Sequence, residues 1–209
     1  LEEGQTIQQF ESDLKEDIRV KESLGVTIHS IVFPRNQMSL HYLNSCKKMG
    51  IRCYRGNEQS WFYRAESVKH KQSNLKRALR LLDAYLNISG HNTYPMEYVK
   101  TEPLYNIPSS RFLRPYSARF SMLENLRMKR IKDSMTEAAM EGKVYHLWWH
   151  PHNFGRDTSE NLAFLEEILH HYKHLHAKYH MNSMNMAEIS ANMQKKPVSV
   201  VEEKQIKSV

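Results

Sequence analysis

Hydrophobic and polar residues alternate along this chain in a way that predicts a repeated unit. In each unit an amphipathic helix ends at a glycine, and a short apolar strand follows. The first helix is expected over 6–24, where apolar residues recur at helical spacing. Gly25 ends it, because glycine adopts the left-handed conformation at little cost, and 26–33 follows as a strand. The apolar face of this helix comprises Ile7, Phe10, Leu14, Ile18 and Leu24.

Two further units have the same order: helix 38–49 with Gly50 and strand 51–54, and helix 122–141 with Gly142 and strand 144–149. Three repeats of helix, glycine and strand favour parallel strands joined by helical crossovers. The sequence therefore predicts an α/β fold.

The rest of the chain reads as one long insertion and one long helix. Periodicity predicts a helix over 73–86, and 87–121, rich in Asn, Pro, Ser and Tyr, is expected to run over the surface at one end of the sheet. The segment 157–180 is a strong helix candidate, with Asp157 and Glu160 as a capping box. Its expected buried stripe comprises Leu162, Leu165, Ile168, Leu169, Tyr172 and Leu175.

Toward the carboxyl end the signals weaken. Residues 184–186 are expected as a last short strand and 187–193 as a final turn of helix. The domain is expected to span 1–194, and 195–209 is expected as a disordered tail because it holds too little apolar surface to form a core.

The chain has 209 residues, enough for one core of ordinary size. It begins at Leu1 rather than Met, so we expect a fragment or a processed product. No apolar run approaches the ~20 residues of a membrane helix. Cys46 and Cys53 show neither metal-site spacing nor a disulfide framework, which favours a reducing cytoplasm.

The net charge is +7, with basic clusters at 64–80 and 127–132. Acidic residues interrupt both clusters, and neither has the interleaved aromatics of a nucleic-acid module. We therefore expect solvated helix faces and no nucleic-acid partner. Binding of an anionic polymer or surface remains the alternative.

Residues 144–154, Val-Tyr-His-Leu-Trp-Trp-His-Pro-His-Asn-Phe, carry the strongest functional signal. An apolar, buried strand is expected to stop at Pro151, which lacks an N–H for a sheet ladder. This leaves His150 and His152 at the carboxyl end of the strand, where parallel α/β folds present catalytic groups. The alternative is that both histidines are hydrogen-bonded packing residues at the start of a loop.

The other predicted strands also deliver candidate residues at their carboxyl ends. The first strand is followed by Arg35 and Asn36, and the second by a segment that reaches Trp61. Together with Trp149 and the two histidines, these residues predict a polar pocket with an aromatic wall, in which a tryptophan face suits a sugar ring. A second histidine group, in the long helix, is expected to be a solvated face rather than a metal site: His170, His171, His174, His176 and His180.

Three segments resemble the NodB-like polysaccharide deacetylases, also called carbohydrate esterase family 4. They are Ser-Ile-Val-Phe-Pro-Arg-Asn-Gln (30–37), Tyr-Arg-Gly-Asn-Glu-x-x-Trp (54–61) and His-Leu-Trp-Trp-His-Pro-His-Asn-Phe (146–154). The likeness is to a bacterial branch associated with surface-polysaccharide gene clusters, and it runs over about 1–193. It implies a distorted (β/α) barrel, of which this chain would supply the later units and lack the first strands.

The resemblance also implies a chemistry and site residues. Members of the family remove N-acetyl, sometimes O-acetyl, groups from sugars with water activated by a divalent metal, usually Zn²⁺. His150 matches the general acid, and Arg35 the arginine that orients the catalytic aspartate. Trp61, Asn36, Trp149 and His152 are expected to contact substrate. Arg114-Pro115-Tyr116 imitates the family arginine motif but comes too late in the chain.

The chain departs from the family at its start. It contains neither the Thr-Phe-Asp-Asp motif nor a His-x-x-x-His motif in a metal-site context, so we expect no metal ligand here. The first hypothesis is therefore a carboxyl-terminal fragment of a metal-dependent sugar deacetylase, inactive alone, whose partner is an acetylated sugar or polysaccharide precursor. The alternative is a non-catalytic family member that binds carbohydrate or acts as a scaffold.

Overall fold

The computed structural model describes residues 5–34, 38–63, 74–99 and 102–195. The helices are α1 (Ile7–Ser23), α2 (Leu40–Lys48), α3 (Asn74–Asp83), α4 (Met96–Val99), α5 (Glu124–Glu141), α6 (Thr158–Tyr179) and α7 (Met186–Lys195). The strands are β1 (Ser30–Ile31), β2 (Cys53–Gly56), β3 (Tyr105–Pro108), β4 (Arg111–Phe112) and β5 (Leu147–Trp148). Short 3₁₀ helices lie at Trp61–Tyr63, Ala118–Leu123 and Pro151–Phe154.

All pairing between these strands is parallel. One sheet has the order β1-β2-β3, and the other pairs β4 with β5. Only Ser109 and Ser110 separate β3 from β4 along the chain, so this segment joins the two sheets. The described strands form two short open sheets, and the partial barrel stays a prediction. Gly56 leaves room for the Asn106 side chain at the end of β2, because a Cβ there would overlap Asn106 Oδ1 and that side chain would have to move.

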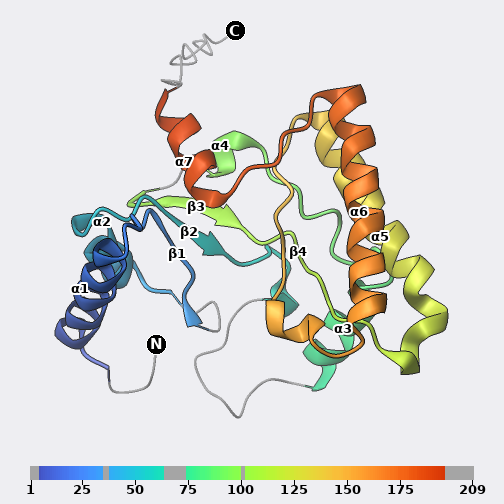
Figure 1. Cartoon of the computed structure of the whole chain (residues 1–209), viewed down its shortest axis with the longest axis horizontal. Coiled ribbons are helices and arrows are strands. Elements are labelled where there is room, and N and C mark those ends of the chain that lie inside the picture. The colour runs from blue at the N-terminus through green and yellow to red at the C-terminus, as the bar shows by residue number, and fades with distance from the viewer. Residues whose placement is uncertain (1–4, 35–37, 64–73, 100–101, 196–209) are drawn as a thin grey trace, which may run out of the picture.

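The three-stranded sheet lies between α1 and α2 at one end of the molecule and α5 and α6 at the other (Figure 1). Successive strand residues point to opposite faces. Tyr54 accordingly packs into a core with α1 and α2, whose buried members are Phe10, Leu14, Phe33, Leu43, Cys46, Ile51, Tyr54 and Leu104. Its neighbour Cys53 belongs to a second core with Val99, Ile107 and Ile189, which places α4 and α7 against β2 and β3.

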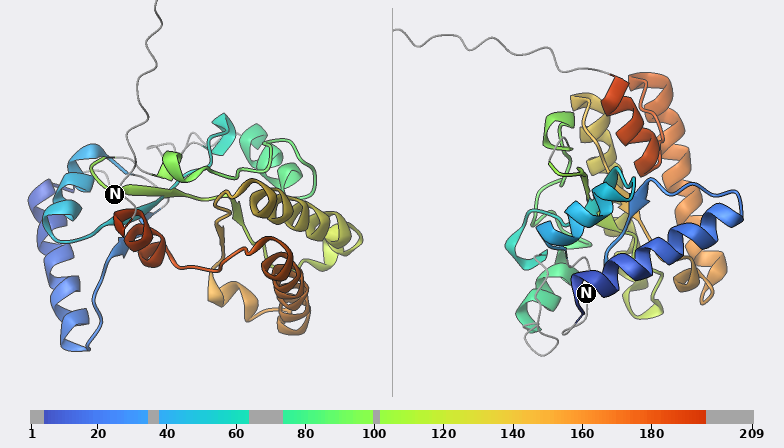
Figure 2. Two further views of the ribbon diagram at one scale, coloured as in Figure 1. Left: turned by 90° about the horizontal axis from the view of Figure 1, so that it is seen from above. Right: turned by 90° about the vertical axis from the view of Figure 1, so that its left-hand side faces the viewer.

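A third core joins the two long helices to the second sheet. Its buried residues are Leu113, Ile131, Met135, Ile168 and Leu175. The Arg127 guanidinium lies 3.8 Å from the centre of the Phe164 ring, which ties α5 to α6. Viewed from above, α5 and α6 stand together, well away from α1 (Figure 2).

Helix ends show where local sequence rules hold. Thr6 and Gln9 form a capping box at the start of α1, and Gly142 ends α5 with a φ of 63°. The expected capping box of α6 is wrong: Asp157 has a φ of 51° and its side chain caps no backbone N–H. Four positions expected on the buried faces of helices are exposed instead: Ile7, Leu24, Leu162 and Leu169.

The main correction concerns 87–121, which was expected as a surface excursion. It contains β3 and β4, and Ile107 and Leu113 within it are 1% exposed. The expected third strand, 144–149, is shorter and only partly buried: Val144 makes an isolated antiparallel bridge with Tyr94, and β5 covers Leu147–Trp148.

Other expectations also change. Residues 184–185 are coil and Met186 begins α7, so the expected last strand is wrong. Arg127 and Arg130, expected on a solvated face, are 2% and 3% exposed. The expected tail falls almost entirely in 196–209, outside the described residues, and the 1–194 boundary stays a prediction. Within the described parts of the chain, no helix is long and apolar enough to cross a membrane.

Candidate functional site

Polar and aromatic side chains gather where β2, β3 and β5 end. Ser109 directly follows β3, and Glu58 and His150 lie two positions after the ends of β2 and β5. β2 and β3 are parallel neighbours, so their carboxyl ends lie at one edge of the first sheet. The hydrogen bond from Trp148 to Ser109 joins the end of β5, in the second sheet, to that edge. The site is therefore built by strand topology from segments far apart in the sequence.

Three of these side chains form a hydrogen-bonded series, which we name the Glu58 relay. The indole N–H of Trp148 donates to Ser109 Oγ at 2.6 Å, and Ser109 Oγ donates to Glu58 Oε1 at 2.8 Å. Ser109 is fully buried and Glu58 is 6% exposed. The relay thus runs from the interior to the aromatic surface beside His150.

Trp148 is the centre of the aromatic part of the site. The Arg55 guanidinium carbon lies 3.7 Å from the centre of its ring, within the range of a cation–π interaction. The Phe112 ring lies 4.6 Å away between centroids. The His150 ring meets Trp148 edge to face, with centroids 5.3 Å apart.

The structure brings His150 and His152 together. Their rings stack with centroids 5.1 Å apart and planes at 20°. Both side chains are exposed. His150 has extended backbone, and Pro151 then begins a 3₁₀ helix that turns the chain and places His152 over its neighbour. Two solvent-accessible imidazoles therefore stand at the end of β5.

The remaining predicted site residues lie elsewhere or outside the described chain. Trp149 stacks on Phe154, with centroids 6.0 Å apart. Trp61 is 52% exposed on its own 3₁₀ helix, where Lys76 Nζ lies 5.8 Å from its ring centre. Arg35 and Asn36 fall outside the described residues, so the roles expected for them stay predictions.

Burial sets the electrostatics of this cluster. It raises the pKa of Glu58, although the Ser109 hydroxyl and the nearby Arg111 and Arg55 charges partly offset the effect. Burial also lowers the pKa of Arg55. It lowers that of His146, whose Nδ1 lies 3.3 Å from the Ile107 carbonyl oxygen. The interior beside the site therefore favours neutral His146 and resists the charge on Glu58.

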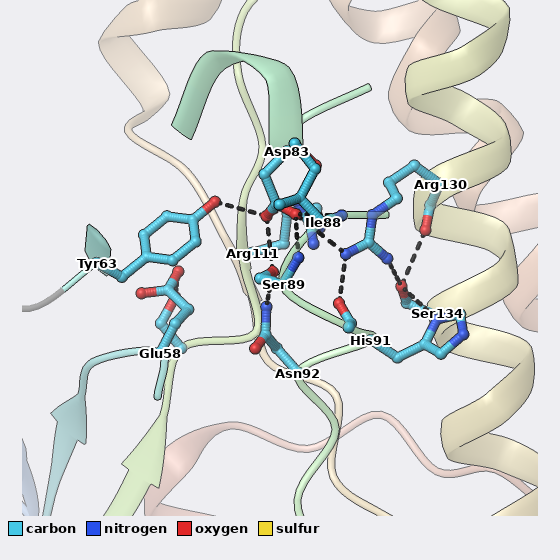
Figure 3. A network of polar contacts seen from close by, with 12 residues as sticks. Glu58, Tyr63, Asp83, Ile88, Ser89, His91, Asn92, Arg111, Arg130 and Ser134 are labelled. Atoms are coloured by element: carbon cyan, nitrogen blue, oxygen red, sulfur yellow. Dashed lines mark hydrogen bonds and ion pairs between the residues drawn. The ribbon is translucent and has the colours of Figure 1, made fainter. Parts of the chain in front are cut away.

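A second buried carboxylate lies close by, in a group that we name the Asp83 cluster: Tyr63, Asp83, Ser89, Arg111 and Arg130 (Figure 3). Asp83 Oδ2 accepts from the Tyr63 hydroxyl at 2.8 Å, from the Ser89 hydroxyl at 2.8 Å and from Arg111 Nη1 at 3.2 Å. Asp83 Oδ1 accepts from the backbone N–H groups of Ile88 and Ser89, and Arg130 lies 3.7 Å from it.

These donors determine the charge state of Asp83. Burial alone would raise its pKa, but Arg111, Ser89 and Tyr63 together outweigh burial and lower it. Figure 3 shows Glu58 beside the Tyr63 ring, outside the dashed contacts to Asp83. The two carboxyl groups are therefore neighbours with opposite pKa shifts.

Sequence reasoning missed five residues of the site: Arg55, Glu58, Ser109, Phe112 and Trp148, the neighbour of the tryptophan that was expected to contact substrate. Arg55 and Glu58 belong to the Tyr-Arg-Gly-Asn-Glu segment, where a charged pair around the end of a strand was a usable signal. Ser109 and Phe112 lie in the segment expected to be a surface excursion, and their spacing from Trp148 gave no local signal.

No three or more His, Cys, Asp or Glu side chains are arranged to hold a metal ion in the ranges that the structure describes. Three histidines of α6 have protein partners of their own, and His171 also stacks on His174. His171 Nε2 lies 3.0 Å from the Thr136 hydroxyl, His176 Nδ1 lies 2.8 Å from the Met181 carbonyl oxygen, and His170 faces Glu166 at 3.6 Å. The donors described here therefore do not fit a divalent metal.

No protein-family model, no curated protein and no solved structure matches this chain.

Proposed function

We propose that this chain carries the aromatic and acid–base part of a site that removes N-acetyl, or O-acetyl, groups from sugars. The observation that carries the proposal is the placement of His150. It is an exposed imidazole at the carboxyl end of a parallel strand, set against Trp148 and beside His152. The resemblance of 146–154 to the NodB-like family falls on this same residue.

The chain's own residues have definable roles in such a reaction. An imidazole nitrogen of His150 holds a proton for the leaving amine nitrogen, which is a poor leaving group until it is protonated. Trp148 and Phe112 provide an apolar wall beside that proton. Trp61 and Trp149 offer exposed aromatic faces of the kind that pack on sugar rings.

A divalent metal, in the family that the sequence resembles, supplies the activated water when it is bound. Since the described residues do not fit such a group, the proposal assigns no step of this chain to a metal. The catalytic roles of Arg35 and the substrate contact of Asn36 stay part of the same proposal.

A second candidate function is carbohydrate binding without catalysis. The half-exposed Trp61 ring favours it, because exposed aromatic faces bind sugars without acid–base chemistry. Under this alternative His150 would contribute contact area alone, so its replacement would weaken binding rather than turnover.

The test is acetate release from N-acetylglucosamine oligomers by the full-length gene product, with His150→Ala and His152→Ala compared. We expect His150→Ala to lower kcat by about 10²- to 10⁴-fold with little change in KM, because the proton is needed in the transition state. His152→Ala is the matched control and should cost far less. A mild His150→Ala beside a crippling His152→Ala, or no acetate release by the wild-type protein, would overturn the proposal.

A further inference from the structure

We propose that Glu58 is a positioning residue, whose buried carboxylate acts through the Ser109 hydroxyl to fix the Trp148 indole against which His150 packs. The consequence for turnover rests on the proposed function. The positioning itself is a property of the folded chain and can be measured without any activity.

The donor and acceptor capacities of the three side chains allow only one direction for the hydrogen bonds of the relay. An indole N–H can only donate, so Ser109 Oγ accepts from Trp148. The single hydroxyl proton of Ser109 is then directed at Glu58 Oε1. A carboxylate at the end of the series strengthens both bonds, because a charged acceptor polarises the hydroxyl and makes it a better acceptor in turn. If Glu58 Oε1 carried a proton, that O–H and the Trp148 N–H would both be donors facing the Ser109 oxygen, and the hydroxyl would lose its acceptor on Glu58.

The relay fixes a ring that has few other polar restraints. Trp148 has one N–H, and Ser109 is its partner. The Arg55 guanidinium packs on the ring, and Phe112 and His150 both contact it. A change in the tilt of the indole would therefore be transmitted directly to the His150 ring. This links an interior carboxylate to an exposed imidazole.

A purely structural role explains Glu58 less well. Glutamine has the same shape, could accept the same bond from Ser109, and would avoid burying a charge. Burial raises the pKa of Glu58, so its ionised form costs the fold free energy. Side chains that destabilise the fold in their charged form are characteristic of functional sites.

Several titratable or charged groups face the relay and must be separated from Glu58 in any experiment. The charges of Arg55 and Arg111 lower the pKa of Glu58. The Glu58 charge in turn raises the pKa of Tyr63 and Tyr94. His150 contacts Trp148 itself. Because the His150 ring touches the Trp148 ring, the comparison is made in a His150→Gln background.

The indole N–H resonances of ¹⁵N-labelled protein report the relay directly. The three signals are assigned with Trp61→Phe and Trp149→Phe variants, and Trp148 is then followed from pH 8 to pH 4 in the His150→Gln background. We expect the Trp148 N–H signal of Glu58→Gln to lie upfield of the wild-type signal at pH 8, because the weaker acceptor shields the proton. The two signals should converge as Glu58 becomes protonated.

Ser109→Ala should shift the Trp148 signal at every pH, whereas Ser110→Ala is the matched control. Ser110 is an equally buried neighbour whose hydroxyl accepts from the His146 backbone N–H instead of from the Trp148 indole. Identical Trp148 signals in wild type and Glu58→Gln at pH 8, or a difference that acidification does not narrow, would overturn the proposal. A similar thermal melt of each variant shows that the comparison is between folded proteins.

In the full-length gene product, Glu58→Gln should lower kcat by about 10- to 100-fold with KM unchanged, since small misplacements of a proton donor are costly. The two proposals fail in different ways. A relay seen by NMR in a protein without deacetylase activity overturns the proposed function alone. Activity that is unaffected by Glu58→Gln, together with an unchanged indole signal, overturns the relay alone.

Discussion

Asp83 and Glu58 are two buried carboxyl groups near Tyr63 (Figure 3), and they differ in their surroundings and in the direction of their pKa shifts. Asp83 is fully buried, yet two backbone N–H groups, two hydroxyls and two guanidiniums surround its oxygens. Glu58 is nearly as buried and accepts a hydrogen bond from the Ser109 hydroxyl, with Arg111 and Arg55 nearby. The first has a lowered pKa and the second a raised one.

The difference shows how the groups around a buried carboxyl set its pKa, because burial raises the pKa of both and only at Asp83 do the surrounding donors outweigh it. Asp83 is fully neutralised, so its charge holds α3, β4 and α5 together and stabilises the fold. At Glu58 burial outweighs the hydrogen bonds and cations that lower its pKa, so its charge is costly to the fold. We assign Asp83 to structure and Glu58 to the site on this basis.

Replacement of Asp83 should cause the largest loss of stability. Asp83→Asn removes the carboxylate that Arg111 and Arg130 share and leaves two buried cations without it. We expect a loss of about 3–5 kcal/mol in the free energy of unfolding, measured in urea at pH 7. Asp133→Asn, which removes an exposed i,i+4 pair with Lys129, is the control and should change little. Equal losses would mean that the Asp83 cluster is not structural.

The stabilisation that Asp83 provides should also depend on pH. Because the folded-state pKa of Asp83 is lowered, its stabilisation is complete above its ordinary pKa and is lost only as pH falls through the folded value. The stability difference between wild type and Asp83→Asn should therefore persist at pH 5 and shrink below pH 4. A difference that vanished between pH 5 and pH 7 would contradict this assignment.

A smaller effect is expected from the donor between the two carboxyls. Tyr63→Phe removes one hydroxyl from Asp83 Oδ2 while Ser89 and Arg111 remain on that oxygen. The loss should be about 1.5 kcal/mol, the lower end for a hydrogen bond to a charged group. Measured by urea unfolding, a loss as large as that of Asp83→Asn would show that the donors on Asp83 are not redundant.

Replacement of Glu58 should change stability least, and it should raise stability instead of lowering it. Because the folded-state pKa of Glu58 is raised, its stabilising form is the protonated one, and this contribution is lost as pH rises through the folded value. Glu58→Gln should therefore unfold at a higher temperature than wild type at pH 8, with the gain disappearing toward pH 4.5. A lower melting temperature at pH 8 would place Glu58 with Asp83 among the structural carboxylates.

Helices and their ends were the most predictable part of this fold. Thr6, Gly25 and Gly142 mark helix boundaries through local conformation, and local rules suffice for them. The α/β arrangement follows from the repeated helix, glycine and strand units. Asp157 failed as a cap because its own backbone is left-handed, which the residue type does not reveal.

The strand at the centre of the site could not be predicted from local pattern. Tyr105–Pro108 has one fully apolar aliphatic residue, and Ser109, Ser110 and Arg111 follow it with polar side chains that are nonetheless buried. These residues are buried because Glu58, His146 and Asp83 supply their partners from distant segments. The same reason explains Arg130, which reads as a surface residue until Asp83 is placed beside it.

The candidate site likewise contains residues that the sequence could predict and residues that it could not. His150 and His152 were predictable because both lie at the end of one strand, within a few residues of each other. Glu58 and Ser109 were not, since 51 positions separate them and only the fold brings them together.

The two serines between β3 and β4 have a further consequence for the dynamics of the molecule. They divide one extended segment between two sheets with different cores. The first sheet packs with α1 and α2 through Ile31 and Tyr54 and with α4 and α7 through Ile107, whereas Leu147 of the second sheet packs with α5 and α6. Cooperative opening units tend to follow such packing boundaries. Backbone amides of β2 and of β5 should therefore exchange with solvent deuterium as separate groups, and the Glu58 relay would then span the boundary between two independently opening halves.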